Sequence, residues 1–277
     1  MSLTNTDPNK VMYFPKFDWP RITNPKIDFS DMNYPEKVSA LEAVAINEIK
    51  AAFENNKDDI AAIIIEPIQG EGGDNHFRPE FFEKLRQLAD ENEALLIYDE
   101  VQTGVGMTGT MWYHEQIGVN PDILCFGKKM QTCGILVGNK IDNEEKNVFR
   151  VSSRINSTWG GNLTDMYRAT RYLEIIEEEN LLDNAKKMGA ALSSKIEALQ
   201  IEYPQEINNP RGAGLFRAFD MKSKENRGKF IEKCFDNGLF ILPCGESAVR
   251  FRPPLTVSEE EISEGFEIIK KSLKEIL

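Results

Sequence analysis

The sequence predicts an α/β protein with an incomplete large domain, built on a mainly parallel sheet, and a smaller α+β domain at the C-terminus. Apolar runs at residues 60–65 and 95–98 flank an amphipathic segment, the pattern of two parallel strands joined by a right-handed helical crossover. Beyond a long helical stretch, short apolar runs and helices alternate in a different order. We therefore expect part of the large domain over residues 1–163, a connecting helical region over 164–200 and the small domain over 201–277.

The first part of the chain predicts a looping segment followed by one helix. Five prolines interrupt residues 1–38, which show no useful periodicity, so we expect an extended, looping segment there. From Ser39 to about Asn56, apolar side chains recur at helical spacing. The apolar stripe of this helix is predicted to be Leu41, Val44, Ile46, Ile49 and Phe53.

A strand–helix–strand unit comes next. Ile60–Ile65 is a continuous apolar run, which predicts a fully buried strand that stops at Pro67. Pro79 opens a helix, because proline suits the first helical turn, and further strands follow at Leu95–Tyr98 and Ile123–Phe126. The loop before the helix is made flexible by Gly70, Gly72 and Gly73, and the helix has an apolar face of Phe82, Leu85, Leu88 and Ala89.

The second half of the chain predicts one more short strand, a long helical region and the small domain. The strand candidate is Cys133–Val137, and the helical region, Thr164–Leu199, is expected to kink near Asn180. The final helix begins with a capping box formed by Ser258 and Glu261. The remaining predictions are strands at Gly214–Phe219, Leu239–Leu242 and Ala248–Phe251, a helix at Lys224–Asn237, and a last helical face of Ile262, Phe266, Ile269 and Leu273.

Composition narrows the classes of function. The 277 residues are 41% hydrophobic and carry a net charge of -12, which fits a soluble globular protein and argues against nucleic acid or an anionic membrane as partner. No apolar run approaches the ~20 residues that span a bilayer. The N-terminus lacks a secretory signal, so we expect a cytoplasmic protein. Four cysteines without a C-x-x-C pair and two isolated histidines predict free thiols and no structural zinc.

Charged side chains end two of the predicted strands, Asp99 after one and Lys128 after the next. Ligands of open α/β sheets bind outside the carboxyl ends of the strands. Each residue has an ordinary interpretation, as a solvated turn acid or a surface lysine, and the adjacent Lys129 is expected at the surface. A buried acid can instead hold a positive charge in a cofactor ring, and a buried lysine can lose its proton and form a Schiff base. Together the two residues predict pyridoxal phosphate as cofactor.

The segment Gly104–Gly109 matches the pattern G-x-G-x-x-G of a dinucleotide site. In such a site the glycines follow a strand directly and open a helix. Here five residues, Asp99 to Thr103, intervene after the strand, and no clean helix start follows. The sequence therefore disfavours a nicotinamide dehydrogenase, and we expect the loop to let the backbone pass close to a ligand or a neighbouring subunit.

Four longer motifs carry a resemblance to a known family. They read I-I-E-P-I-Q-G-E-G-G, L-L-I-Y-D-E-V-Q-T-G-V-G-M-T-G, P-D-I-L-C-F-G-K-K and S-T-W-G-G-N. Together they resemble the class III (omega) aminotransferases, which implies the pyridoxal-phosphate-dependent transferase fold of type I from about Ile60 to the C-terminus. Within that family, F-G-K-K-M-Q-T-C-G and V-R-F-R-P-P-L-T-V-S are similar to the lysine 6-aminotransferase branch.

The resemblance implies roles on pyridoxal 5′-phosphate for four residues. Lys128 would hold the cofactor as a Schiff base and move the proton during amino transfer. Asp99 would pair with the pyridine nitrogen, and Gln102 would contact the region of the 3-hydroxyl and the substrate. Thr158 would donate to the cofactor phosphate of a partner subunit, which implies a homodimer with shared active sites.

The resemblance also implies L-lysine and 2-oxoglutarate as substrates, with L-glutamate and the lysine-derived semialdehyde as products. Arg250 would grip a substrate carboxylate, a bidentate task that suits a guanidinium, and Arg252 is its local rival. Glu71 would neutralise Arg250 while the amine donor presents its distal amino group, and would swing away for the α-carboxylate of glutamate.

Relatives of this kind carry a segment before the equivalent of residue 1, with the phosphate-binding loop, the aromatic that stacks on the ring and a second substrate arginine. We therefore expect Met1 to be an internal or truncated start, with edges of the large sheet left exposed. Two alternatives stay open: an ornithine- or 4-aminobutyrate-type aminotransferase, and an inactive fragment that serves only as a dimerisation module.

Overall fold

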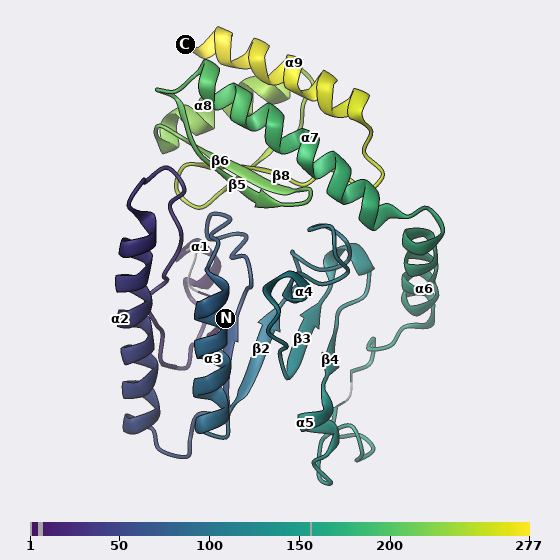
Figure 1. Ribbon diagram of the computed structural model, residues 1–277. Coiled ribbons are helices and arrows are strands. Elements are labelled where there is room, and N and C mark those ends of the chain that lie inside the picture. The colour runs from purple at the N-terminus through teal and green to yellow at the C-terminus, as the bar shows by residue number, and fades with distance from the viewer. Residues whose placement is uncertain (1, 5–7, 156) are drawn as a thin grey trace.

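The computed structural model describes residues 2–4, 8–155 and 157–277. Two four-stranded sheets lie one above the other in the view of Figure 1, the lower one from the N-terminal half and the upper one from the C-terminal part. Helices flank both sheets. Among the described residues, no helix combines the length and the apolar character needed to cross a membrane.

The lower sheet has the strand order β1-β2-β3-β4. β1 (Ala62–Ile65), β2 (Leu95–Asp99) and β3 (Ile123–Phe126) are parallel, and β4 (Gly134–Val137) runs antiparallel to β3. The predicted strand–helix–strand unit and the mainly parallel sheet are therefore confirmed. Because the three parallel strands share one direction, their carboxyl ends meet at the edge that faces the upper sheet (Figure 1).

Two helices, α2 (Tyr34–Asn55) and α3 (Pro79–Glu91), pack side by side next to the lower sheet (Figure 1). α3 begins at Pro79, as predicted, and packs against Leu96 and Tyr98 of β2. Burial of apolar surface, at about 25 cal/mol per Å², is the main stabilising contribution here. The buried face of α3 consists of Phe81, Phe82, Leu85, Leu88 and Ala89.

The predicted stripe of α2 is partly wrong. The helix begins at Tyr34, where Pro35 occupies the first turn, and not near Ser39. Leu41 and Val44 of the predicted stripe are 38% and 47% exposed. The reason is that only one face of the helix packs against the rest of the chain, so fewer side chains are buried than the predicted stripe contains. That buried set is Val38, Glu42, Ala45 and Ile49.

The two outer strands of the lower sheet are more exposed than the apolar runs suggest. The run at residues 60–65 is not a fully buried strand, because β1 is an edge strand on which Ile64 is 39% exposed. On the opposite edge, β4 leaves Ile135 and Leu136 43% and 47% exposed. Within the described residues each of these strands pairs on one side only, which agrees with the expected exposed edges.

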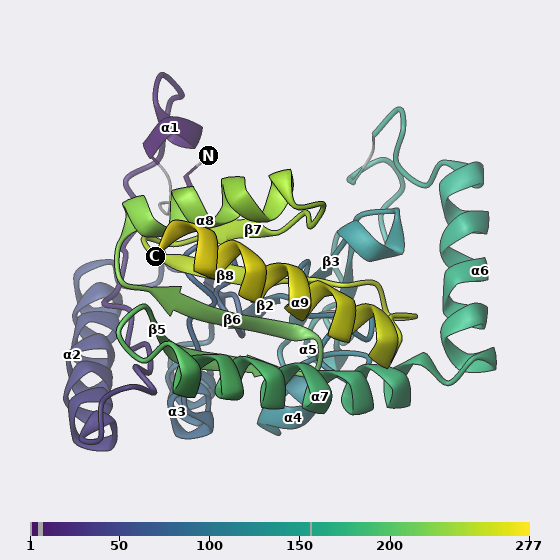
Figure 2. The same cartoon turned by 90° about the horizontal axis from the view of Figure 1, so that it is seen from above.

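The loops of the N-terminal half contain short helices. They are α1 (Pro8–Val11), α4 (His114–Ile117), α5 (Asn139–Asp142) and a 3-10 helix at Lys128–Met130 directly after β3. The long helical region then divides into α6 (Leu163–Glu178) and α7 (Leu181–Glu202). The break falls at Asn180, whose φ of 52° is left-handed, so the predicted kink is a full interruption. Figure 2 shows α6 at the edge of the molecule, and buried side chains of α6 and α7 belong to one apolar cluster.

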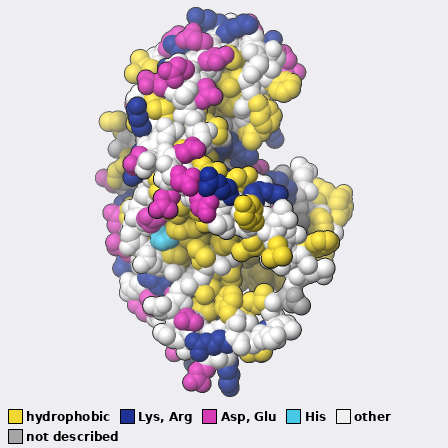
Figure 3. Space-filling model, turned by 90° about the vertical axis from the view of Figure 1, so that its right-hand side faces the viewer, with side chains coloured by type: hydrophobic (Ala, Val, Ile, Leu, Met, Phe, Trp, Pro, Cys, Tyr) yellow, Lys and Arg dark blue, Asp and Glu magenta, His cyan; other side chains and the backbone are white. Residues whose placement is uncertain are grey.

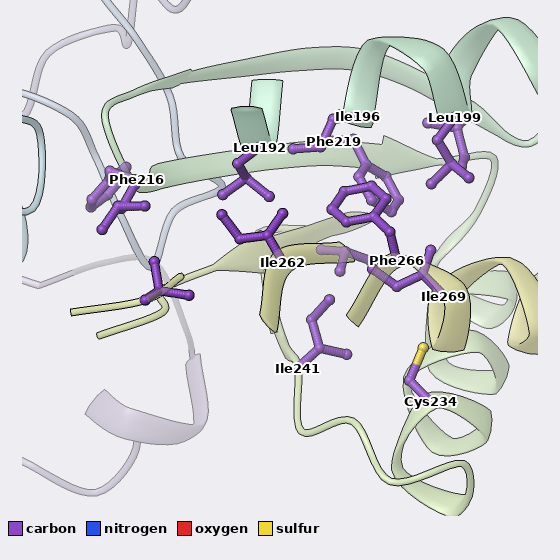
Figure 4. Packing of buried hydrophobic residues seen from close by; sticks show 14 of the residues in the cluster. Leu192, Ile196, Leu199, Phe216, Phe219, Cys234, Ile241, Ile262, Phe266 and Ile269 are labelled. Carbon is purple, nitrogen blue, oxygen red and sulfur yellow. The ribbon is translucent and has the colours of Figure 1, made fainter. Parts of the chain in front are cut away.

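The upper sheet is antiparallel, with the order β5-β6-β8-β7. Side chains from α7, β6, α8 and α9 form one apolar core, in which Phe219, Ile262 and Phe266 lie close together (Figure 4). The capping box of Ser258 and Glu261 starts α9 as predicted, and the predicted apolar face of this helix is buried. The elements are β5 (Ile207–Ala213), β6 (Phe216–Met221), α8 (Lys224–Asp236), β7 (Leu242–Cys244), β8 (Ala248–Phe251) and α9 (Glu259–Ile276).

Three features of the upper sheet differ from the sequence prediction. β5 is an additional strand, and its Pro210 is tolerated because β5 lies at a sheet edge. β6 starts two residues after Gly214, whose φ of 52° belongs to the turn before the strand. The predicted strand Leu239–Leu242 is displaced to Leu242–Cys244, since the N–H of Leu239 donates to the carbonyl of Cys234 and closes the end of α8.

Candidate active site

Charged side chains stand at all three parallel strand ends. Glu66 follows β1, Asp99 ends β2, and Lys128 follows β3 after Gly127. The register sets Asp99 opposite Cys125, so the two residues predicted to hold the cofactor lie at adjacent strand ends. Figure 3 shows the surface hollowed between the upper and lower parts of the molecule, with Lys and Arg side chains near the hollow.

Asp99 and Glu100 are neighbours in sequence but differ in burial and in hydrogen-bond partners. Asp99 is half-buried, and its Oδ1 accepts a hydrogen bond from the N–H of Val101 at 3.0 Å, which orients the carboxyl. Glu100 is buried and accepts from the N–H groups of Tyr113 and His114 at 2.6 and 2.9 Å. Glu100 is therefore a structural anchor for the following loop, and Asp99 is the acid of the site.

Lys128 is exposed at the start of the 3-10 helix and has a φ of 47°. A left-handed backbone at a residue other than glycine costs of order 1–3 kcal/mol and is found most often at functional sites. Within the described residues, the Nζ of Lys128 has neither a hydrogen-bond acceptor nor an ion-pair partner. The amine is thus presented at the strand end without being tied to the protein.

Lys129 corrects a sequence prediction, because it is not a surface residue. Its Nζ donates to the main-chain carbonyl of Gln102 at 2.8 Å, in a half-buried position. Burial, with smaller contributions from Arg252 and Lys128, lowers the pKa of Lys129 to about 8. This lysine ties the end of β3 to the loop after β2 and so fixes the position of Gln102.

The side chain of Gln102 fills the space beside Gly70. A Cβ at Gly70 would lie 2.7 Å from the Cδ of Gln102, too close for any side chain without displacing the amide. The glycine therefore lets the loop after β1 approach the loop after β2. The structure thus brings Gln102, Asp99 and Lys128 to one edge of the sheet.

Glu66 is a site residue that the sequence interpretation missed. Its Oε2 accepts from the N–H of Gly70 at 3.0 Å, and burial, reinforced by the nearby Asp99 and Glu71, raises its pKa to about 7. The signal was present, because the motif I-I-E-P puts an acid directly after a predicted strand, as L-I-Y-D does for Asp99.

Glu71 and Arg250 meet across the two sheets. The Nη1 of Arg250, on β8, lies 3.1 Å from Oε2 of Glu71, and the Nζ of Lys10 lies 2.9 Å from Oε1. Burial alone would raise the pKa of Glu71, but the two cations outweigh it and hold the pKa below its ordinary value. The side chain of Glu71 is 39% exposed, so this pair is open to exchange with a carboxylate from solution.

Arg252, the predicted rival of Arg250, is engaged elsewhere. Its Nη2 lies 2.6 Å from the Oδ1 of Asp74, and its guanidinium stacks 3.2 Å above the centroid of the Phe216 ring. Asp74 is 1% exposed. Arg250 is therefore the guanidinium that faces the exposed carboxylate.

The structure does not bring Thr158 to these residues. It lies in an exposed turn segment that precedes α6, at the edge of the molecule (Figure 2). In the part of the chain that the structure describes, it has no hydrogen bond to Lys128, Asp99 or Gln102.

The glycine loop 104–109 packs closely against other parts of the same chain. A Cβ at Gly104 would lie 2.5 Å from the Trp112 ring, and one at Gly109 would lie 2.7 Å from the Lys186 side chain. These contacts are within the chain, and the expected approach to a ligand or a neighbouring subunit stays a prediction. A helix does not open directly at this loop, since α4 begins at His114.

Two cavities flank the lower sheet. One of about 640 Å³ lies beside β1 and is lined by residues 19–26, Glu66, Gln69 and Asp99 among others. The other, of about 580 Å³, lies near β3 and β4 and is lined by Arg86 and Asp122, away from Lys128. The described residues hold no cluster of three or more His, Cys, Asp or Glu suited to a metal ion.

The sequence profile of the class-III aminotransferases matches residues 1–273, and the chain belongs to that family. It is 49% identical over 273 residues to the L-lysine-epsilon aminotransferase of Mycobacterium tuberculosis (strain ATCC 25618 / H37Rv), covering 99% of this chain and 60% of that protein. Against the enzyme of the same name from Amycolatopsis lactamdurans the identity is 47% over 274 residues, which cover 99% of this chain and 61% of that one.

Solved structures agree with this assignment. A lysine aminotransferase from M. tuberculosis superposes with a TM-score of 0.96 and 48% identity, over 100% of this chain and 63% of that one. The α/β fold of the class III aminotransferases is thereby confirmed. The chain spans about 60% of the length of the curated relatives it matches.

Proposed function

We propose that the chain is the part of an L-lysine 6-aminotransferase that carries the catalytic lysine. The reaction moves the ε-amino group of L-lysine to 2-oxoglutarate with pyridoxal 5′-phosphate and gives L-glutamate and the lysine-derived semialdehyde. The observation that carries the proposal is the placement of Asp99 and Lys128 at adjacent strand ends, together with the ion pair between Glu71, in the loop after β1, and Arg250 on β8. Identities of 43–49% to lysine aminotransferases support it.

The residues present fit the cofactor's ring. Asp99 offers a half-buried carboxylate for a protonated pyridine nitrogen, and Lys128 offers an amine without a protein partner within the described residues. When bound, pyridoxal phosphate supplies an electron sink beside the reacting nitrogen. Lys128 Nζ would hold the cofactor and later carry the proton, and Gln102, fixed by Lys129, would flank the ring.

Substrate choice would rest on the exchange of partners at Arg250. With Glu71 in place, the guanidinium is neutralised, and the site favours a donor whose distal end carries no acid. When the carboxylate of 2-oxoglutarate enters, Glu71 leaves and Arg250 binds the acid in a bidentate manner. Lys10 would then hold the displaced Glu71, since it already contacts the other carboxylate oxygen.

The proposed assembly is a cytoplasmic homodimer in which Thr158 serves the cofactor phosphate of the partner subunit. Large apolar side chains next to Thr158 support this proposal, because Trp159, Leu163 and Tyr167 are 79%, 87% and 78% exposed. Exposed apolar patches of this kind mark protein–protein contacts. Size-exclusion chromatography with light scattering measures the oligomeric state, and a monomer at all concentrations would contradict the assembly.

The assignment of Lys128 is tested by spectroscopy. Addition of pyridoxal phosphate to the chain should give the visible absorption of a lysine-bound cofactor, and Lys128→Met should abolish it. Lys129→Met is the matched control, which should keep the band because Lys129 acts through Gln102. Retention of the band in Lys128→Met would overturn the assignment.

A second candidate is a 4-aminobutyrate-type aminotransferase, because the chain is 38% identical over 250 residues to the human mitochondrial 4-aminobutyrate aminotransferase, over 87% of this chain and 48% of that one. A panel of L-lysine, L-ornithine and 4-aminobutyrate as donors separates the two. Turnover with L-lysine alone supports the leading proposal, and turnover with 4-aminobutyrate alone supports the second.

A further inference from the structure

Two arginines with separate tasks stand two residues apart at the end of β8. Arg250 lies in β8 and Arg252 directly follows the last residue of the strand, Phe251. Each has a carboxylate partner from the same loop of the lower half, at 3.1 Å for Glu71 with Arg250 and 2.6 Å for Asp74 with Arg252. The loop thus supplies one acid to each guanidinium.

The two pairs differ in access to solvent. The side chain of Glu71 is 39% exposed and is shared between Arg250 and Lys10. Asp74 is 1% exposed, and Arg252 is additionally held over the Phe216 ring and by the carbonyl of Phe251 at 2.7 Å. A buried ion pair that loses one member leaves an uncompensated charge. The Asp74–Arg252 pair is therefore locked, and the Glu71–Arg250 pair is exchangeable.

The main chain around Glu71 is also fixed to the upper sheet. Arg211 donates to the carbonyls of Gly73 and Asp74 at 2.6 and 3.0 Å, and the N–H of Gly245 donates to the carbonyl of Glu71 at 2.9 Å. Arg211 itself is 6% exposed. The main chain around Glu71 is therefore anchored, whereas its side chain is partly exposed.

We propose that Asp74 is a specificity-determining positioning residue, which captures Arg252 so that Arg250 is the single guanidinium offered to Glu71 or to a substrate carboxylate. This inference rests on the proposed role of Arg250. Without Asp74, the guanidinium of Arg252 becomes a second hydrogen-bond donor to carboxylates next to Arg250. Glu71 alone would then no longer neutralise the two guanidiniums. The site would bind dicarboxylates both when the amine donor reacts and when 2-oxoglutarate reacts.

The test measures binding of glutarate, a dicarboxylate with the spacing of 2-oxoglutarate and no reactive carbonyl, to the full chain by isothermal titration calorimetry without cofactor. Asp74→Asn should bind glutarate about tenfold more tightly than the parent, because a released guanidinium adds a charge-assisted hydrogen bond. The double variant Asp74→Asn/Arg252→Gln should return to the affinity of the parent. A purely structural role for Asp74 predicts instead that the double variant binds as the single variant does, and that result would overturn the inference.

Two further variants separate this inference from the proposed function. Arg250→Gln should weaken glutarate binding by at least about tenfold, whereas Arg252→Gln should change it by less than about twofold. Equal losses in these two variants would show that Arg252 is not locked and would overturn the inference even if Asp74→Asn fails to fold. Failure of the parent to bind glutarate, or unchanged binding in Arg250→Gln, would remove the role of Arg250 and with it the inference.

Discussion

The two sheets differ in how they are supported and in what they supply to the site. The upper sheet is packed against α7, α8 and α9, and the side chains of Phe216, Phe219 and Val249 are completely buried. Among the described residues both sheets have two unpaired edges, and in the lower sheet the edge strand β1 leaves Ile64 39% exposed. The upper sheet carries Arg250, the guanidinium of the proposed substrate site. The lower sheet carries the acid and the amine at its strand ends.

The largest expected effect is in the upper core. Phe219→Ala should lower the free energy of unfolding by about 3–5 kcal/mol, because a completely buried aromatic is removed and a cavity remains. Urea denaturation followed by circular dichroism measures the change. A loss below about 1 kcal/mol would show that the upper sheet is not the better-supported part.

Glu66 in the lower half should make stability depend on pH. Its pKa is raised from 4.5 to about 7, so the folded chain binds this proton more tightly than the unfolded chain does. The contribution of Glu66 to the free energy of unfolding is fully present below pH 4.5. It is lost as the pH rises towards about 7, which lowers the free energy of unfolding by roughly 2 kcal/mol after allowance for partial exposure. Glu66→Gln should remove that pH dependence in urea titrations across this range. Parallel curves for the two proteins would contradict the environment assigned to Glu66.

A matched pair of glycines sharpens the comparison. A Cβ at Gly189 in α7 would lie 2.3 Å from main-chain carbon of Gly214, whereas one at Gly70 meets the movable side chain of Gln102. Gly189→Ala should therefore cost about 1–3 kcal/mol. Gly70→Ala should cost less in stability and should instead shift the absorption of bound cofactor, since it displaces Gln102. Equal stability losses would mean that the two halves are equally rigid.

The smallest effect is expected at the open edge of the lower sheet. Ile64→Ala should change stability by less than about 1 kcal/mol, because much of the side chain is exposed. Leu96→Ala in the neighbouring strand is the control, with an expected loss of about 2–5 kcal/mol. Similar losses at the two positions would show that β1 is covered in solution.

Strands and helices whose bounds are set by their own residues could be predicted from the sequence. The charged residues at the ends of those strands could be predicted as well. β3 and β8 have the predicted bounds, and Asp99 and Lys128 follow from apolar runs that stop at a charge. β5 could not be found from its pattern, because Pro210 and its neighbours interrupt the apolar alternation and only the edge position makes them acceptable. The face of α2 depends on what packs against it, which no single stretch encodes.

The parts of the site that sequence could not provide are contacts between distant segments. The environment of Lys129 depends on a carbonyl 27 residues away. Arg211 donates hydrogen bonds to the loop around Glu71, and its two acceptors there are 137 and 138 positions away in the sequence. Glu66 is a different case, because it could have been found from the sequence. Like Asp99, it is an acid that comes directly at the end of a predicted apolar strand.

The left-handed backbone of Lys128 has a consequence for engineering the chain. A φ of 47° is a conformation that glycine adopts without steric cost and lysine does not, a difference of roughly 1 kcal/mol. Lys128→Gly should therefore unfold at a higher temperature than Lys128→Ala, although neither can hold the cofactor through an amine. With the role proposed for Lys128, thermostability and turnover are opposed at this position, and a screen that rewards heat resistance alone would select against the proposed Schiff-base lysine.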